Sequence, residues 1–122
     1  MTERGLRKVL IVDDDRDASA ELGELLECHE CVVRTDATAA EAETAMQEMR
    51  PDVALLDIQL GGESGIDLAA RWTAAPDAGP TVILTSGRAP DAREIAHLKG
   101  KVTSFVLKPI DAYALLALLD AL

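Results

Sequence analysis

Aromatic side chains and positive charge are both scarce in this chain of 122 residues. Aromatic residues make up 2% of the sequence, as Trp72, Phe105 and Tyr113, so no row of rings is available to stack single-stranded bases. The 12 lysines and arginines stand against 22 acidic residues, which gives a formal net charge of -10. Because proteins bind nucleic acids through clustered basic side chains, we expect no direct nucleic-acid binding by this chain.

Long hydrophobic runs are also missing from the sequence. Charged residues interrupt every apolar stretch before the roughly 20 residues that a membrane-spanning helix needs. The charged start Thr2-Glu3-Arg4 precedes an apolar run of strand length rather than the longer core of a secretory leader. We therefore expect no membrane association, and we expect the protein in the cytoplasm.

Cysteine is limited to Cys28 and Cys31, which enclose His29 in a single C-x-x-C. Such a pair could be half of a zinc site or a redox pair. A zinc site needs four ligands, and the sequence has neither a second cysteine pair nor an H-x-x-x-H to complete it. We therefore favour a structural role, with Cys31 buried in a strand and Cys28 at the end of a helix.

Four short apolar runs each end in a polar group, and these groups differ in kind. Parallel strands that are buried on both faces have this composition, and their carboxyl ends lie along one edge of the sheet, where open α/β folds hold ligands. Three carboxylates, a hydroxyl and an ammonium group at one edge would suit a hard cation and a phosphoryl group. The runs 9–12, 53–56, 82–84 and 105–107 lead into Asp13 and Asp14, Asp57, Thr85 and Ser86, and Lys108 and Pro109.

The chain has the size of one domain. Its 122 residues with 48% hydrophobic content can bury a core without disulfides or a structural metal, so we expect a single domain over 1–122 with residues 1–5 as an N-terminal extension. Segments with helical spacing separate the apolar runs, and a strand followed by a helix five times over is typical of a parallel sheet with right-handed crossovers. We predict strands over 8–12, 31–35, 53–56, 81–84 and 104–107.

The first two predicted helices each carry one apolar stripe, which we expect to face the sheet. These stripes are Ala18, Leu22, Leu25 and Leu26, and then Ala42, Ala45, Met46 and Met49. Residues that satisfy the free N–H groups at helix starts mark three helix boundaries. The capping pairs are Thr38 with Glu41, Ser64 with Asp67, and Asp91 with Glu94.

The last helix is apolar on two sides, because nothing charged lies between Asp111 and Asp120. A helix of this kind usually buries both sides. We expect one stripe to pack on the sheet and the other to meet a homodimer partner or an output domain. The alternative is an alanine- and leucine-rich helix whose outer residues are simply exposed. The two stripes are Ala112, Leu115, Leu116 and Leu119, and Ala114, Leu118, Ala121 and Leu122.

Together the motifs resemble the receiver domain of two-component response regulators, from Leu6 to the end of the chain. The shared features are an acidic doublet after the first strand, an aspartate ending the third, Thr-Ser ending the fourth and Lys-Pro ending the fifth. The resemblance implies a flavodoxin-like, doubly wound (βα)5 fold of the α/β class, with a five-stranded parallel sheet of order 2-1-3-4-5. It implies a phosphorylation-dependent signalling switch that catalyses its own phosphorylation and slow dephosphorylation, rather than an enzyme.

By this resemblance Asp57 is the phosphoacceptor, which receives a phosphoryl group from a phosphohistidine of a sensor histidine kinase or a histidine phosphotransfer protein. Asp14 would bind Mg²⁺ directly and Asp13 through water, with Asp57 and the main-chain carbonyl of Gln59 completing the protein ligands. Three neighbouring carboxylates repel a phosphoryl dianion, so a divalent cation is needed before the group can approach.

The same resemblance implies that Lys108, a compact positive charge, contacts Asp57 before phosphorylation and the phosphoryl group afterwards. Pro109 would follow a cis peptide bond at the turn after the fifth strand. The main-chain N–H groups of Ser86 and Ile58 would bind phosphoryl oxygens.

Thr85 and Phe105 match the switch positions of the family. The Thr85 hydroxyl would hydrogen-bond a phosphoryl oxygen, and Phe105 would fill the space that Thr85 leaves. This movement would change the surface made by the fourth helix, the fifth strand and the fifth helix, and so control a partner or an output domain.

Two other functions compete with this interpretation. Asp13-Asp14-Asp15 contains the D-x-D of haloacid-dehalogenase-like, Mg²⁺-dependent phosphatases. That assignment leaves Asp57 without a role and lacks the acidic metal motif that those enzymes carry after the lysine. A pseudo-receiver, which keeps the fold without phosphorylation, is the third alternative, and the intact set of site residues argues against it.

Overall fold

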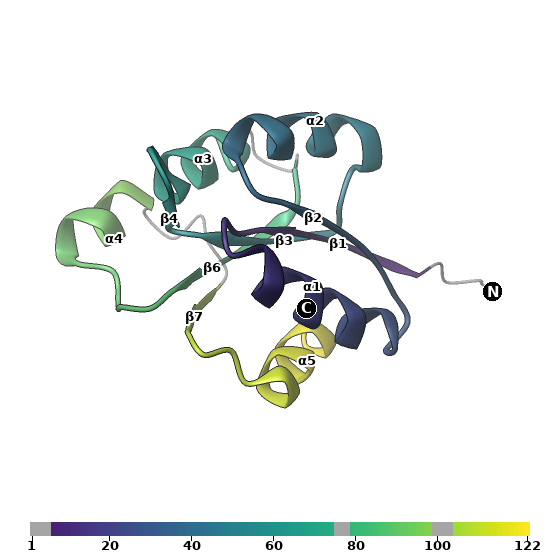
Figure 1. Cartoon of the computed structure of the whole chain (residues 1–122). Coiled ribbons are helices and arrows are strands. Elements are labelled where there is room, and N and C mark those ends of the chain that lie inside the picture. Colours follow the sequence, from purple (N-terminus) through teal and green to yellow (C-terminus); the bar gives the residue numbers. More distant parts are fainter. Residues whose placement is uncertain (1–5, 75–78, 99–103) are drawn as a thin grey trace.

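A computed structural model describes residues 6–74, 79–98 and 104–122, and its centre is a five-stranded parallel sheet (Figure 1). The strand order is β2-β1-β3-β6-β7. In chain order these are the first to fifth strands of the sheet, so the predicted order 2-1-3-4-5 is confirmed. Residues 1–5, expected as an extension, lie outside the described part. The strands of the sheet are β1 (Arg7–Val12), β2 (Cys31–Asp36), β3 (Val53–Asp57), β6 (Thr81–Ser86) and β7 (Ser104–Leu107).

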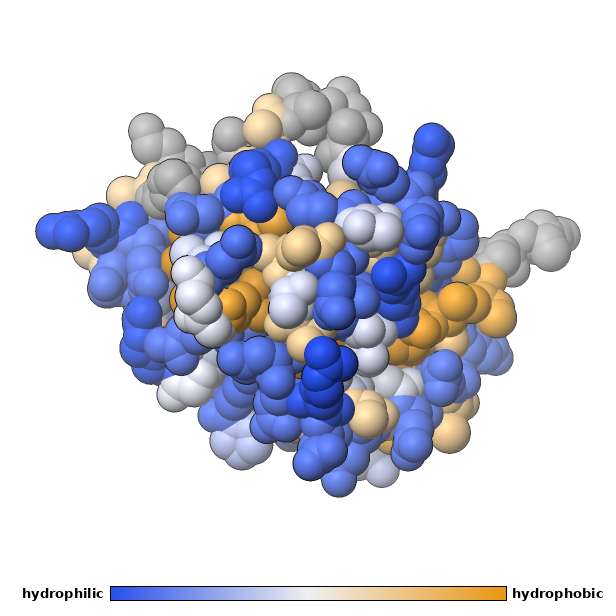
Figure 2. All heavy atoms as spheres, turned by 45° about the horizontal axis from the view of Figure 1, so that its top comes forward, coloured by the Kyte–Doolittle hydropathy of each residue, from blue (hydrophilic) through white to orange (hydrophobic). Residues whose placement is uncertain are grey.

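Helices cover both faces of the sheet and give the molecule three layers (Figure 1). One face carries α2 and α3, the other carries α1 and α5, and α4 contacts α3. Figure 2 shows hydrophilic side chains over most of the outer surface seen from the α2 and α3 side. The described residues include no helix long and apolar enough to cross a membrane; the cytoplasmic location stays a prediction. The helices are α1 (Arg16–Glu27), α2 (Ala39–Met49), α3 (Gly65–Trp72), α4 (Ala92–Leu98) and α5 (Ala112–Asp120).

The apolar runs form strands because each lies between two hydrophobic clusters. Successive side chains of a strand point to opposite faces, so Leu10 and Val12 join the cluster under α2 and α3. Val9 and Ile11 join the cluster under α1 and α5. Every residue of β3 is buried. This burial on both faces fixes the strand ends, and therefore the polar residues that follow them.

The face of α1 that packs on the sheet differs from the predicted one. Leu26 is fully buried and Leu22 packs against the same cluster, as expected, but Ala18 is exposed. Ser19 and Gly23 take the buried positions instead. A Cβ atom at Gly23 would lie 3.3 Å from the Cγ1 atom of Val33. The helix therefore approaches β2 most closely at Gly23, which has no side chain. This orientation of the helix turns Ala18 away from the sheet.

The other helix predictions are largely confirmed. In α2, Ala42 and Ala45 are buried, and Met46 and Met49 pack against the cluster. Thr38 and Ser64 accept hydrogen bonds from the free N–H groups at the starts of α2 and α3. In α5, Leu115 and Leu119 are buried. Its second stripe is only partly covered within the described chain: Ala114, Ala121 and Leu122 are exposed, and Leu118 is half-buried against the cluster under α1 and α5.

A small hairpin follows the strand that ends in Asp57 and was not among the elements predicted from the sequence. It consists of β4 (Gln59–Leu60) and β5 (Glu63–Ser64), which pair in antiparallel fashion. Gly61 has a φ of 62° in the turn, a conformation that favours glycine. Gly65 then returns the chain to β3, where its N–H donates to the Ile58 carbonyl at 2.7 Å.

Gly65 is predicted to be essential for this close contact. A Cβ atom there would lie 1.9 Å from the Asp57 carbonyl oxygen, so Gly65→Ala must push α3 away from the strand that carries Asp57. We expect the free energy of unfolding to fall by about 1–3 kcal/mol, measured by urea denaturation. Gly62→Ala is the matched control, since no described atom lies within 4 Å of its added Cβ. Equal stability of the two variants would contradict the prediction.

Candidate functional site

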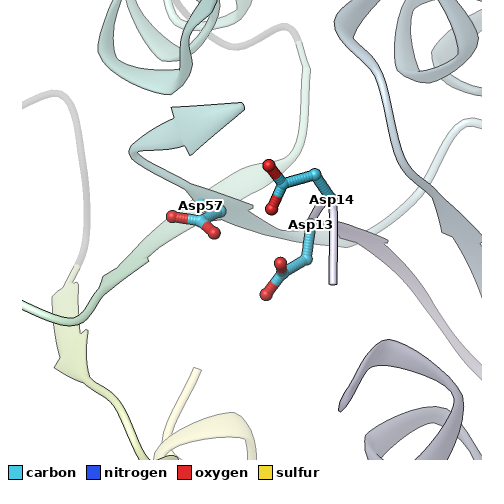
Figure 3. A group of neighbouring side chains, drawn as sticks. All are labelled: Asp13, Asp14 and Asp57. Carbon is cyan, nitrogen blue, oxygen red and sulfur yellow. The ribbon is translucent and has the colours of Figure 1, made fainter. Parts of the chain in front are cut away.

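Three carboxylates meet at the carboxyl edge of the sheet. Asp13, Asp14 and Asp57 each offer one oxygen atom, and these oxygens lie within 4.8 Å of one another. Figure 3 shows the two side chains that follow β1 beside the one that ends β3. Asp13 and Asp57 are buried, whereas Asp14 is exposed. The geometry therefore joins Asp57 to two residues that are 43 and 44 positions before it in the sequence, in one acidic group that is open on one side.

The main chain holds the two buried carboxylates in place. The Asp13 N–H donates to the Asp36 carbonyl of β2 at 3.0 Å, and Asp13 Oδ1 accepts from the Asp15 N–H at 2.9 Å. Asp57 Oδ1 accepts from the Gln59 N–H at 3.0 Å. One oxygen of each carboxylate is thus engaged by a main-chain donor.

The second oxygen of each buried carboxylate binds the same ammonium group. Lys108 Nζ donates to Asp13 Oδ2 at 2.7 Å and to Asp57 Oδ2 at 2.8 Å. Lys108 directly follows β7, and its N–H donates to the Ser86 carbonyl at 2.8 Å. The peptide bond between Lys108 and Pro109 is cis, as the resemblance implied.

The charges at this edge do not balance, because one lysine faces three carboxylates. Burial, reinforced by the negative charge of Asp13, raises the pKa of the Asp57 carboxyl group. The hydrogen bonds from Lys108 and Gln59 lower this pKa but offset the rise only in part. Burial alone would lower the pKa of Lys108, but its hydrogen bonds to Asp13 and Asp57 outweigh burial and raise it. The site therefore holds excess negative charge that a cation would relieve.

Comparison with known proteins identifies the family to which this arrangement belongs. The family of the response regulator receiver domain matches residues 9–120. The chain is a response regulator receiver domain. It is therefore a signalling switch of two-component systems, and the phosphatase and pseudo-receiver alternatives are not favoured.

Relatives of known name support the same assignment. The phosphate regulon transcriptional regulatory protein PhoB of Rhizobium meliloti is 32% identical over 119 residues, which cover 96% of this chain and 52% of the relative. The DNA-binding response regulator MtrA of Mycobacterium tuberculosis H37Rv is 30% identical over 113 residues, with 91% and 48% covered. The receiver domain thus spans about half the length of these relatives.

Solved structures agree with the fold. The activated receiver domain of Klebsiella pneumoniae RstA has a TM-score of 0.82 at 25% identity, and the superposition covers 94% of this chain and 97% of that one. A receiver domain from Methanospirillum hungatei has a TM-score of 0.85 at 25% identity, with 96% and 93% covered.

Thr85 and Ser86 lie beside the carboxylates at the end of β6. Thr85 pairs with Asp57 in the register of β3 and β6, and the Ile58 N–H donates to the Thr85 carbonyl at 2.9 Å. Both hydroxyl residues are buried, with 3% and 1% of their surface exposed. Phe105 of β7 is half-buried against the cluster under α2 and α3. Thr85 and Ser86 thus lie at the carboxyl end of β6, and Phe105 lies near the start of β7, while their assigned roles stay predictions.

The receiver domain's acidic group fits the Mg²⁺ that this family binds at its acidic pocket. Mg²⁺ prefers oxygen ligands, keeps several waters and is bound through one or two carboxylates together with phosphate oxygens. Here Asp14 is exposed while Asp13 and Asp57 are fixed, so the group combines fixed ligands with an open side. The metal role of the Gln59 carbonyl stays a prediction, since the Gln59 contact described here is its N–H to Asp57.

A cavity next to the site was not predicted from the sequence. It measures about 610 Å³ and extends from Asp13 and Lys108 along α1 to Ile110. Small side chains leave this space open, among them Ala18, Ser19 and Ala112. Small residues in α1, including Ala18 and Ser19, could have indicated this cavity from the sequence. It was missed because Ala18 was expected to pack on the sheet.

The raised pKa of Asp57 has a consequence for stability. A carboxyl group with a raised pKa in the folded state stabilises the fold below its ordinary pKa, and this contribution is lost as the pH rises through the folded value. Asp57→Asn removes the charge and keeps one acceptor oxygen, which can serve either Lys108 or the Gln59 N–H. We expect this variant to have a higher free energy of unfolding than the wild type at pH 7.5, by on the order of 1 kcal/mol.

Urea denaturation at several pH values tests this expectation. The difference between Asp57→Asn and the wild type should narrow toward pH 4 and below, where the wild-type carboxyl group takes up a proton. Asp52→Asn is a suitable control, because Asp52 is an exposed carboxylate outside the site that accepts a hydrogen bond from the Lys8 N–H. A wild type more stable than Asp57→Asn at pH 7.5 without divalent metal would contradict the expectation.

Proposed function

We propose that this receiver domain accepts a phosphoryl group on Asp57 and changes conformation in response. The observation that carries the proposal is the Lys108 ammonium bound to both Asp13 and Asp57, with the exposed Asp14 carboxylate beside them. This set supplies a nucleophile, a compact positive charge for phosphoryl oxygens and oxygen ligands for a metal.

The phosphodonor in this proposal is a phosphohistidine of a sensor histidine kinase or of a histidine phosphotransfer protein. An Asp57 carboxylate oxygen attacks the phosphorus atom, the new P–O bond forms, and the P–N bond breaks so that the histidine ring leaves with its electron pair. Mg²⁺, held by Asp13, Asp14 and Asp57 with the carbonyl of Gln59, supplies charge neutralisation when bound. The chain catalyses this step on itself, and slow hydrolysis of the acyl phosphate later transfers the phosphoryl group to water, which releases inorganic phosphate and restores the Asp57 carboxylate.

The residues around Asp57 provide the other contacts of the product. Lys108 exchanges its hydrogen bond with Asp57 for one with a phosphoryl oxygen, since an ammonium on a flexible stem can follow a moving anion. The N–H groups of Ile58 and Ser86 and the hydroxyl of Thr85 bind the remaining oxygens. Because the Ile58 N–H donates to Thr85 in this structure, that bond has to open in the phosphorylated state.

Conformational change follows from Thr85 and Phe105. Thr85 is buried next to Asp57 in the sheet register, and Phe105 pairs with Leu84 on the neighbouring strand. When the Thr85 hydroxyl turns toward the phosphoryl group, Phe105 moves into the space that it leaves. Phenylalanine gains no hydrogen bond there, so packing alone separates the two states and the phosphoryl group shifts their populations.

Phosphorylation is tested by intact-mass analysis after incubation with Mg²⁺ and acetyl phosphate. We expect the wild type to gain the mass of one phosphoryl group, and we expect no gain in Asp57→Asn or in wild type treated with a metal chelator. Lys108→Gln should lower the extent of phosphorylation at least about tenfold, because the site loses its positive charge. Asp52→Asn is the control, because it removes one carboxylate outside the site and should still gain the mass of one phosphoryl group.

The alternatives predict different results in the same assay. A wild type that gains no phosphoryl mass would leave the pseudo-receiver in place. A haloacid-dehalogenase-like phosphatase would instead turn over a phosphomonoester, with activity lost in Asp13→Asn and kept in Asp57→Asn.

We further propose that the exposed face of α5 binds a protein partner, either a second copy of this chain or an output domain. Tyr113 is 81% exposed and Leu122 is 44% exposed, and the helix carries no charge between its ends. Relatives named as a transcriptional regulatory protein and as a DNA-binding response regulator are about twice as long as this chain. Nucleic-acid binding would then belong to an output domain, and the acidic receiver domain would act through protein contacts.

Sedimentation velocity tests the self-association form of this proposal. We expect the phosphorylated chain to dimerise, and Ala117→Glu, in the exposed part of α5, to weaken the dimer more than about tenfold by placing a charge in an apolar contact. Ala40→Glu adds the same charge at an exposed position of α2 and should leave the dimer intact. A strict monomer in both phosphorylation states would exclude self-association.

A further inference from the structure

Arg88 and Glu94 form a two-pronged ion pair directly after the Thr85-Ser86 end of β6. Arg88 Nη1 lies 2.9 Å from Glu94 Oε1, and Arg88 Nη2 lies 2.9 Å from Glu94 Oε2. Two charge-assisted hydrogen bonds between a guanidinium and a carboxylate fix relative orientation as well as distance. The Arg88 hydrogen bond and the Asp91 N–H together lower the pKa of Glu94 to about 2, so the pair stays charged where carboxyl groups ordinarily titrate.

Glu94 also closes the loop onto the start of α4. Its Oε1 atom accepts from the Asp91 N–H at 2.9 Å, and its own N–H donates to Asp91 Oδ1 at 2.8 Å. The sequence predicted the capping pair of Asp91 and Glu94, but not the arginine that joins it. The Glu94 carboxylate therefore accepts hydrogen bonds both from Arg88 in the loop and from the Asp91 N–H just before α4.

Packing does little to hold the same loop. Gly87, Arg88 and Ala89 are exposed, and no described atom lies within 4 Å of the position that a Cβ at Gly87 would take. Ser86, by contrast, is 1% exposed, its carbonyl accepts from the Lys108 N–H, and its hydroxyl accepts from the Arg88 N–H at 3.2 Å. The loop thus runs from a fixed point at Ser86 to a second fixed point at the Arg88–Glu94 pair.

We infer that Arg88 and Glu94 are positioning residues for phosphoryl transfer to Asp57, an inference that rests on the function proposed above. The pair holds the backbone that follows Thr85 and Ser86, which are the residues that receive the phosphoryl oxygens. With the pair intact, these donors are in place before the phosphodonor arrives. With the pair broken, the incoming phosphoryl group has to order an exposed, glycine-containing loop, which slows the transfer.

The test compares phosphorylation rates of Arg88→Gln, Glu94→Gln and the double variant in the full chain, with acetyl phosphate and saturating Mg²⁺. We expect each single variant to react about fivefold to tenfold more slowly than the wild type, and the double variant to react no more slowly than either, as two halves of one interaction do. Mg²⁺ affinity, measured by calorimetry, should not change, because the three carboxylates are untouched. Arg88→Lys keeps the charge and should recover part of the rate.

The control is Arg71→Gln, which breaks another exposed arginine–glutamate pair, between Arg71 Nη2 and Glu43 Oε2 at 3.2 Å. This variant should keep a rate within about twofold of the wild type. Amide hydrogen exchange should increase at residues 87–89 and at Asp91 in the Arg88 and Glu94 variants and not in the control.

Failure of the inference differs from failure of the proposed function. A wild type that takes up no phosphoryl group overturns the function. A phosphorylated wild type whose Arg88 and Glu94 variants react equally fast or faster overturns the positioning role. Effects that add in the double variant, or a loss of rate that Arg71→Gln shares, overturn it as well.

Discussion

The hydrogen bonds from Lys108 to Asp13 and Asp57 are the interaction on which the rest of the site depends. They bring the end of β7 to the ends of β1 and β3, past the intervening strand β6. One positive charge cannot neutralise three carboxylates, so the site keeps a surplus of negative charge. Burial, reinforced by the Asp13 charge, raises the pKa of Asp57. Such an arrangement persists only where the surrounding fold holds it. The site is thus suited to the cation and the phosphoryl group of the proposed function.

The fold supplies this restraint through the sheet rather than through the loops. Asp57 belongs to a strand whose residues are all buried, and Thr85 lies opposite it in the register. Moving either residue would disturb apolar packing on both faces of the sheet, which costs far more than one surface ion pair contributes. Where the chain leaves the sheet, single contacts replace the ladder: Gly65 against Asp57, and Glu94 against Arg88. The loops are therefore the parts of the site that substitutions can loosen without unfolding the domain.

Sequence reasoning located the site because its chemistry coincides with the ends of apolar runs. Burial on both faces makes a parallel strand easy to recognise, and the polar residue that follows is then placed by the architecture. The hairpin after Asp57 escaped prediction because its strands have two residues each, too few for a periodic pattern. Ala18 was misplaced because periodicity gives the spacing of a helical stripe but not how closely a helix can approach the sheet. How closely α1 can approach depends on the contact between Gly23 and Val33. These residues belong to different elements, so the periodicity of the helix alone does not predict their contact.

The position of β7 explains how a change at Asp57 would reach a distant surface. Thr85 pairs with Val106 and Ser86 with Leu107, so a shift at the end of β6 acts on β7 through their shared hydrogen bonds. Phe105 extends from β7 into the cluster under α2 and α3, while Val106 packs into the cluster under α1 and α5. One edge strand thus contacts both layers, with the half-exposed Leu107 at its end and the exposed Tyr113 in the helix that follows. A rearrangement of Thr85 and Phe105 would therefore change the surface formed by β7 and α5. On this surface an uncharged helix face is available to a partner.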